Sequence, residues 1–479
     1  MSRIKFVAPR IIGHPGADAI LVEDDRIVAI GHRRDLVAMH SIEHDGELGA
    51  PRHDHHFHPF GYAGAVLGLS LKQAGSFTGL ERQVRAELAG IKRGEALIGN
   101  RLDEEALAEH RLPTRLDLDP ITGNVPTLIY RYCGHLAVAN SAALALAGLA
   151  DHRDGILRET EIAPVAEVLA SLRPVLPTGD VKDVLAGLAS LGLGKITAIV
   201  SASEPLWCEV ADEVGTLLEI APGLPLDLEV LVIASTPSEL RATAETVRQA
   251  GIANLRFLGW KEFADGALGA RTAALHEPFS DDLDNRGILR LDTTHAYEMA
   301  IACRDLGATI AIHAIGDRAN DAVLSFFAGL IDDGVASSSL RIEHASMLDG
   351  PARHRMAALG ITASVQPAFI TSEVDWLSTR VGDRVEDTYA LGDMEQAGIR
   401  LLGGSDCPVE SPNPWPAMAA AVTAGLNPDS AYRLYGPPLA VGDAAHLIET
   451  TDLVEGQKTV RSVYRHGQPI ELLPAHDLG

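Results

Sequence analysis

Residues 294–313, THAYEMAIACRDLGATIAIH, join a helical stretch to a short apolar strand that ends in a histidine. The helical part covers Thr294–Leu306, and the strand covers Ala308–His313. Apolar strands and helical stretches alternate in this way through the middle of the chain, which is typical of a parallel sheet with crossover helices. Eight strands are expected, which predicts a (β/α)8 barrel of the TIM type in the α/β class. They cover about 53–58, 195–202, 226–233, 254–263, 308–313, 340–344, 361–366 and 400–406.

The spacing of these strands is uneven at one place. About 135 residues separate the first two strands, whereas a crossover needs only about 30. We therefore expect residues 60–169 to form a subdomain inserted over the barrel mouth. Residues 1–50 and 437–479 have strand character, but neither piece buries enough apolar surface alone. We therefore expect them to pair into one small β-sandwich. The barrel then takes residues 51–59 and 170–436.

The composition is that of a folded protein with an acidic surface. Of 479 residues, 46% are hydrophobic and 22% are charged, and the formal net charge is −25. This charge repels phosphate backbones and anionic lipids, so neither nucleic acid nor a membrane is an expected partner. Charges break every long apolar run, and the N-terminus lacks the apolar core of a signal peptide. Four widely spaced cysteines favour a reduced, cytoplasmic protein.

A cluster of histidines is the densest chemical signal. Four of the nineteen histidines fall within His53-Asp-His-His-Phe-His58. Alternate side chains of a strand share a face, so His56 and His58 point the same way. Two imidazoles at a strand end can reach one metal ion, and imidazole suits zinc, iron, nickel and copper. An exposed histidine-rich turn is the alternative interpretation.

Later strands also carry polar side chains near their ends, where a barrel places its active site. Any one of them alone is better explained as a buried side chain with its hydrogen bonds made, a helix cap or a surface charge. Together with the paired histidines they predict a metal site. They are Lys261, His313, His344 and Asp406.

Lys261 lies inside an apolar strand. A buried lysine tends to lose its proton. The neutral amine can then add CO₂ and form a carbamate, which resembles a carboxylate and can bridge two metal ions. An ordinary ion pair with Asp265 is the alternative.

The sequence resembles the amidohydrolase superfamily, specifically its YtcJ-like branch (amidohydrolase 3 type), which includes N-substituted formamide deformylases. The resemblance spans nearly the whole chain and implies a barrel with a two-part β-sandwich. It rests on His56-Phe-His58, Arg131-Tyr-Cys-Gly-His-Leu-Ala-Val-Ala-Asn-Ser-Ala-Ala-Leu144, Lys261-Glu-Phe-Ala-Asp-Gly-Ala-Leu-Gly-Ala-Arg-Thr-Ala-Ala-Leu275, His313-Ala-Ile-Gly-Asp-Arg-Ala319, Arg341-Ile-Glu-His344 and Gly404-Ser-Asp406.

The resemblance also implies a set of metal ligands. His56 and His58 would bind a buried metal, and a carboxylated Lys261 would bridge it to a second metal held by His313 and His344. Asp406 would contact the buried metal and the nucleophilic water. The ligands follow one another along the chain in the order of the strand ends found above.

The segment before the histidine pair departs from the family pattern. Family members usually have a Pro-Gly-Phe-Ile-Asp-like approach, whereas this chain has Ala50-Pro-Arg-His-Asp-His-His-Phe-His58. The added His53 and His55 predict an irregular first strand, in which His55 competes for the metal. His56 and His58 are preferred because Asp54 precedes them at the family spacing.

These features predict a metal-dependent amidohydrolase that cleaves an amide C–N bond of a small N-acyl or N-formyl compound. One or two divalent metal ions, expected to be zinc, would activate a hydroxide, with Asp406 as general base and then general acid. The same site could instead act on a cyclic amide, a lactone or another ester, or run a lyase or isomerase reaction. A metal-binding protein without catalysis is the third hypothesis.

Several side chains near these motifs are expected to contact the substrate. His135, from the inserted subdomain, would hydrogen-bond the substrate or the developing oxyanion, or else serve packing. Arg271 and Arg318 would hold a substrate carboxylate or form structural ion pairs. Gln366 would line the pocket, and Trp376 would form part of a lid or cover the barrel rim. A homo-oligomer is compatible with the sequence.

Overall fold

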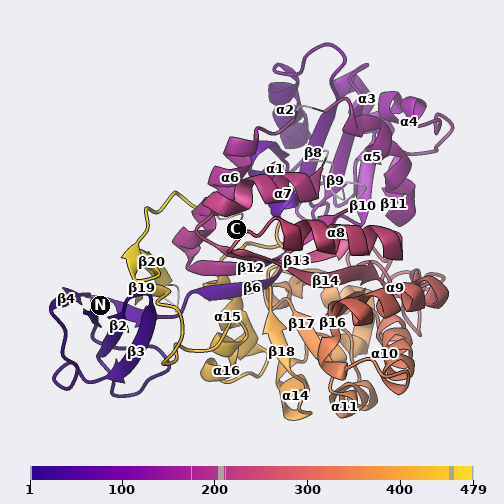
Figure 1. The fold of residues 1–479 in the computed structure, drawn as a ribbon. Coiled ribbons are helices and arrows are strands. Elements are labelled where there is room, and N and C mark those ends of the chain that lie inside the picture. Colours follow the sequence, from indigo (N-terminus) through magenta and orange to yellow (C-terminus); the bar gives the residue numbers. More distant parts are fainter. Residues whose placement is uncertain are drawn as a thin grey trace.

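The computed structural model describes residues 3–173, 175–202, 210, 212–452, 458–476 and 478. At its centre lies a parallel sheet of eight strands whose spatial order is their chain order (Figure 1). The prediction of an eight-stranded α/β barrel is therefore confirmed. The strands are β6 (Arg52–Phe57), β12 (Leu193–Ser201), β13 (Asp227–Ile233), β14 (Leu255–Phe263), β15 (Thr309–Ala314), β16 (Leu340–His344), β17 (Thr362–Val365) and β18 (Leu401–Gly403).

Helices follow these strands and cover the outside of the sheet. None of the helices in the described part of the chain is long and apolar enough to cross a membrane. The barrel helices are α1 (Pro59–Leu67), α6 (Thr178–Ala186), α7 (Glu213–Ile220), α8 (Pro237–Gln249), α9 (Thr293–Leu306), α10 (Asp317–Asp332), α11 (Gly350–Leu359), α12 (Phe369–Ser372), α13 (Val374–Val381), α14 (Leu391–Gln396), α15 (Pro414–Thr423) and α16 (Pro428–Arg433).

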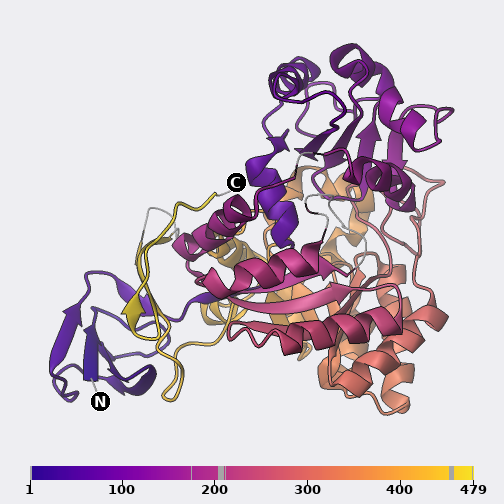
Figure 2. The same ribbon diagram turned by 45° about the horizontal axis from the view of Figure 1, so that its top comes forward.

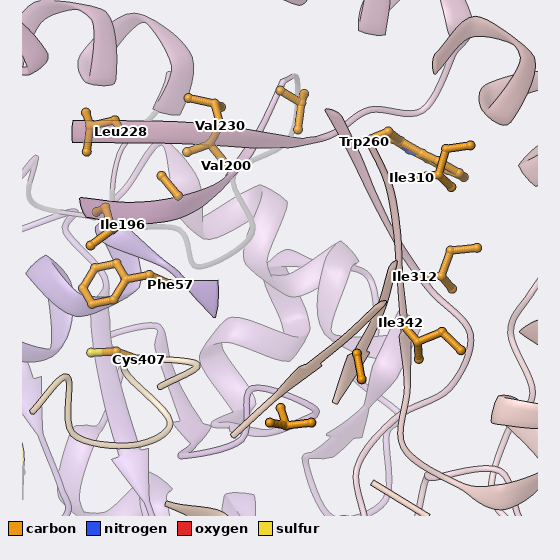
Figure 3. Close-up of a cluster of buried hydrophobic side chains, with 14 of the residues drawn as sticks. Phe57, Ile196, Val200, Leu228, Val230, Trp260, Ile310, Ile312, Ile342 and Cys407 are labelled. Carbon is orange, nitrogen blue, oxygen red and sulfur yellow. The ribbon is translucent and has the colours of Figure 1, made fainter. Parts of the chain in front are cut away.

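Alternation along each strand separates two kinds of side chain. Figure 3 shows the outward-facing set, for example Ile196 and Val200 of β12, in a buried hydrophobic cluster. Leu240 of α8 belongs to the same cluster, so this set packs under the helices. Residues between them, such as Ile199 and Leu231, form a separate cluster inside the barrel. Period-2 patterning thus aims alternate residues at the interior, where the functional side chains lie.

The two ends of the chain form sheets that lie side by side (Figures 1 and 2). The first has the order β3-β2-β1-β4 and the second β21-β20-β19-β5. Phe6 and Val22 of the first sheet share one hydrophobic cluster with Leu48, Leu447 and Tyr464 of the second. The strands are β1 (Arg3–Val7), β2 (Ala19–Glu23), β3 (Arg26–Gly31), β4 (His40–Glu43), β5 (Glu47–Gly49), β19 (Leu447–Asp452), β20 (Lys458–Arg465) and β21 (Gln468–Pro469).

The long segment between β6 and β12 contains a lobe of its own. It is built on a five-stranded sheet with the order β11-β10-β9-β8-β7, and a hydrophobic cluster covers each face. In Figure 1 it lies above the barrel, away from the terminal strands. Its elements are β7 (Leu69–Ser70), α2 (Phe77–Leu88), β8 (Leu97–Leu102), α3 (Arg115–Thr122), β9 (Thr127–Arg131), β10 (Leu136–Ala139), α4 (Ser141–Leu146), β11 (Ile156–Arg158) and α5 (Ile162–Ala170).

The barrel closes between β6 and the residues that follow β18. Phe57 forms a parallel bridge with Cys407, and Asp406 N–H donates to His56 O at 2.8 Å. The buried carboxylate of Asp54 accepts hydrogen bonds from Ser405 N–H at 3.0 Å and Ser405 Oγ at 2.5 Å. We call these contacts the β6–β18 seam. A side chain could not replace the hydrogen of Gly404, because a Cβ there would lie 2.7 Å from His56 N.

We expect Asp54→Ala to weaken the seam. It leaves the buried Ser405 hydroxyl and backbone N–H groups without their acceptor, a change that costs about 1–3 kcal/mol of unfolding free energy. Urea denaturation of the metal-free protein measures this loss. Asp45→Ala is the matched control, because Asp45 is exposed. Equal midpoints for the two variants would show that the seam does not depend on Asp54.

Candidate metal centre

The histidine-rich strand β6 contains a β-bulge. Ile196 and Ala198 of β12 pair with Asp54 and Phe57 of β6, so β6 has one extra residue at this point. A bulge re-aims the side chains that follow it. The expected irregularity of the first strand is therefore present, and it lies between Asp54 and Phe57.

The two pairs lie in different places. The rings of His53 and His55 are tilted by 38° with their centroids 3.6 Å apart, and His53 Nε2 lies 3.0 Å from Thr197 Oγ1. His56 Nε2 and His58 Nε2 lie 3.2 Å and 3.1 Å from the same oxygen of Asp406. Among the described residues, His56, His58 and Asp406 are the group whose ligand atoms converge closely enough for a metal ion. The preference for His56 and His58 over His55 agrees with this geometry.

Strained backbone conformations bring His344 and Asp406 close to His56. Asp406 has φ 57° and His344 has φ 72°, both in the left-handed region that non-glycine residues rarely occupy. Neighbours on a regular strand, such as Glu343 and His344, would face opposite ways. Because the chain turns at His344, its ring lies 4.9 Å from that of His56, while Glu343 also contacts His56. Strain of this kind is common at functional sites.

Three histidines each use one ring nitrogen in a hydrogen bond to a neighbouring residue. His56 Nδ1–H donates to Glu343 Oε2 at 2.6 Å, and His344 Nδ1–H donates to Gln366 Oε1 at 2.7 Å. His313 Nε2–H donates to Gly266 O at 3.0 Å. With a metal bound, the opposite nitrogen of each ring would carry the lone pair, which is how metal-binding histidines are oriented in proteins. The donor set therefore fits a divalent metal ion.

Lys261 lies in the same interior, with its side chain almost fully buried. Its Nζ has no hydrogen-bond partner among the described residues and sits 3.8 Å from the centre of the Phe263 ring. Burial lowers the pKa of this amine to about 8. Asp265, the alternative partner, uses its carboxylate on the backbone N–H groups of Ala274, Ile315 and Gly316. A buried amine of this kind fits the proposed carbamate better than an ion pair.

The two carboxylates of the site are held ionised by their neighbours. Burial would raise the pKa of Asp406, but His56 and His58 hold it well below its usual range. Burial acts in the same way on Glu343, and Arg341 together with His56 lowers its pKa well below normal. Asp406 can therefore serve as a ligand and a proton acceptor at neutral pH.

A cavity of about 830 Å³ opens above these ligands. The barrel contributes the metal-binding side chains to its lining, and the lobe contributes Cys133, His135, Glu159 and one face of α5. His135 stands between β9 and β10, with its ring 5.4 Å from that of His313. The lobe thus covers the end of the barrel at which the ligands converge.

A model of the amidohydrolase family matches residues 53–448 of this chain. The chain belongs to the amidohydrolase family. The match confirms the resemblance drawn from the sequence, and it includes β6, all later barrel strands and the inserted lobe.

This amidohydrolase is similar to other proteins over most of its length. It is 27% identical over 387 residues to YtcJ of Bacillus subtilis, covering 77% of this chain and 72% of that protein. It is 25% identical over 390 residues to an N-substituted formamide deformylase of Arthrobacter pascens, covering 74% and 69%. The structure superposes on an uncharacterized metal-dependent hydrolase from Pyrococcus horikoshii with a TM-score of 0.70, at 25% identity and 91% and 92% coverage. The protein is a metal-dependent hydrolase.

The other residues expected to touch substrate have different surroundings. Gln366 is buried and supports His344. Trp376 is buried in a cluster that also contains Leu136 of the lobe. Arg271 pairs with Asp281 at 2.8 Å, and Arg318 is exposed on α10. None of these four side chains belongs to the described cavity lining, so their contact with substrate stays a prediction.

Glu343 was assigned only a structural or supporting role from the sequence. Its contact with His56 makes it the orienting carboxylate of a predicted ligand. In the sequence Asp54 served only to choose the histidine pair, whereas in the structure it joins the two sides of the β6–β18 seam. The sequence signal for both is an ionisable residue inside an apolar strand, beside a predicted ligand.

We expect Glu343→Gln to lower the affinity for zinc by about 10–100-fold, since an orienting carboxylate of a metal-binding histidine has effects of this size. Competition with a chromogenic chelator measures the affinity, and thermal unfolding checks the fold. Glu298→Gln, an exposed change on α9, is the control. Unchanged zinc affinity in a folded Glu343→Gln protein would contradict the orienting role.

Proposed function

We propose that this amidohydrolase hydrolyses the amide C–N bond of a small N-acyl or N-formyl amine. The observation that carries the proposal is the buried group of His56, His58 and Asp406 at the floor of a substrate-sized cavity. A formamide deformylase among the relatives supports an amide as the substrate class.

The metal-binding residues would be His56, His58, His313, His344, Asp406 and Lys261 as its carbamate. A divalent ion held there would polarise a carbonyl oxygen and lower the pKa of water from about 15.7 to roughly 7. Asp406, ionised and facing the cavity, is placed to take the proton of the attacking water. The same carboxyl group can then pass the proton to the leaving nitrogen, which needs one to depart as an amine.

His135 contributes from the opposite side of the cavity. Its ring lies 5.4 Å from that of His313, so it can contact a substrate bound beside the metal ligands. A hydrogen bond from this ring would orient the amide or stabilise charge as it develops.

The charge of the outer cavity narrows the substrate class. Apart from the metal ligands, the described lining has four carboxylates, on Glu159, Glu167, Glu262 and Asp292, and one cation, Arg290. Arg290 is already paired with Glu159 at 2.8 Å. No unpaired cation remains in this described lining to receive a carboxylate, so neutral or amine-bearing substrates fit best.

We expect the zinc-loaded protein to hydrolyse N-formyl and N-acetyl benzylamine, and chelation to abolish this activity without unfolding the barrel. Amine release, measured by liquid chromatography, gives the rate. Asp406→Asn is expected to lose activity on the order of 10²–10⁴-fold, the contribution of a general acid–base group. If the metal-loaded protein hydrolyses only esters or lactones in a parallel screen, the amide proposal is wrong.

The same benzyl series tests the charge of the cavity. Derivatives with a para-aminomethyl or a para-carboxyl group differ in charge at the end remote from the amide. We expect kcat/KM to be higher for the neutral parent compound and for the para-aminomethyl derivative than for the para-carboxyl derivative. A preference for the carboxylate would contradict the assignment of neutral and amine-bearing substrates.

Lys261 supplies a separate test. We expect labelled bicarbonate to give a carbamate carbon signal in the NMR spectrum of the zinc-loaded protein and none in Lys261→Ala. This variant should also bind less zinc and lose activity, and a short carboxylate such as acetate should partly restore both. Lys261→Arg should not recover, because a guanidinium keeps its charge and repels the metal. An unmodified lysine in an active, fully metal-loaded protein would refute the carbamate.

A further inference from the structure

His135 and Glu159 form a pair within the inserted lobe. His135 Nδ1 lies 3.1 Å from both carboxylate oxygens of Glu159, so Nδ1–H donates to this carboxylate. The backbone N–H of Glu159 in turn donates to His135 O at 3.1 Å. Glu159 has φ 48°, a conformation that non-glycine residues rarely adopt. Two kinds of hydrogen bond therefore join Glu159 to His135, one from its backbone and one through its carboxylate.

The barrel holds the same carboxylate from the other side. Arg290 Nη1 donates to Glu159 Oε2 at 2.8 Å, and Thr272 supplies a hydroxyl hydrogen bond. The space for the carboxylate exists because residue 266 is glycine: a Cβ there would lie 2.1 Å from Glu159 Oε1. Gly266 O is also the acceptor for His313 Nε2–H. The barrel therefore fixes the position of the Glu159 carboxylate from the side opposite His135.

This arrangement selects one state of the His135 ring. With Nδ1–H bound to Glu159, Nε2 is the nitrogen that remains for the cavity, which His135 lines. Burial alone would raise the pKa of Glu159, but His135, Thr272 and Arg290 lower it to about 2. The carboxylate is therefore an ionised acceptor throughout the neutral range.

We propose that Glu159 is the positioning residue of the active site in the inserted lobe: it fixes the tautomer and direction of His135 so that Nε2 faces the substrate. Glu159 does not touch the reacting atoms and acts only through His135. The proposal rests on the proposed amide hydrolysis for its kinetic test, whereas its tautomer test needs no substrate.

A glutamine at position 159 separates positioning from packing. Glutamine keeps the size of the side chain, but only one of its two terminal atoms accepts hydrogen bonds. Arg290 donates to Oε2, so we expect the oxygen to stay there and the amide NH₂ group to take the place of Oε1. Both positions lie 3.1 Å from His135 Nδ1, so the NH₂ group competes with the oxygen and favours a ring that accepts at Nδ1 and carries its hydrogen on Nε2.

Nitrogen NMR of protein labelled in its histidines tests this change of tautomer directly. We expect the His135 signal, assigned by its loss in His135→Gln, to show the Nδ1–H form in the native zinc-loaded protein. In Glu159→Gln the share of the Nε2–H form should rise. Glu161→Gln is the matched control, because Glu161 lies in the same turn and its carboxylate accepts from Arg158 N–H. An identical His135 signal in native protein and Glu159→Gln would overturn the proposal, whether or not amides are substrates.

A double-mutant cycle gives the functional test. Misdirecting a group that contacts substrate can cost about 10²-fold in rate, so we expect Glu159→Gln and His135→Ala each to lower kcat/KM by that order. Combined, they should lose no more than His135→Ala alone, because Glu159 acts only through this ring. Losses that multiply in the double variant would show an independent, structural role for Glu159 and overturn the proposal. If no amide is hydrolysed, the NMR result still decides it.

Discussion

The metal centre depends on the closure of the barrel between its first and last strands. His56 and His58 stand on one side of this seam and Asp406 stands on the other, more than 300 positions later in the sequence. Asp54 joins the two sides by accepting hydrogen bonds from Ser405, and it also accepts from His56 N–H at 3.0 Å. One buried carboxylate therefore sets the register of β6 against the segment that carries Asp406. If this register slipped, the three ligand atoms would no longer converge.

The remaining ligands depend on departures from regular strand geometry. A regular strand could present only every second residue of β6 or β16 to the interior. The bulge in β6 and the positive φ of His344 add one inward-facing side chain to each strand. Glu343 can then support His56 while His344 itself faces the centre. The site thus packs more polar groups into the barrel than strand alternation alone would allow.

The barrel strands and the ligand types could be predicted from the sequence because both are local signals. Apart from the histidine-rich β6, each strand is a short apolar run, and each ligand is an ionisable residue in or just after a strand. The supports of the ligands could not be predicted, since they depend on pairs far apart in the chain, such as Glu343 with His56 and Asp54 with Ser405. Arg271 and Arg318 show the same limit. Their nearness to the motifs in sequence says nothing of direction, and Arg271 turns to Asp281 while Arg318 turns to solvent.

His53 and His55 help to fill the barrel interior on the side away from the cavity. They lie below the metal ligands with Thr197 and Glu229, and the tightly packed Ile199, Leu231 and Ala311 occupy the interior beside them. Side chains thus fill this described part of the barrel interior. Among the described residues, the cavity beneath the lobe is the place where a substrate can reach the metal ligands. A product released there leaves through the same cavity, so it competes for space with the next substrate.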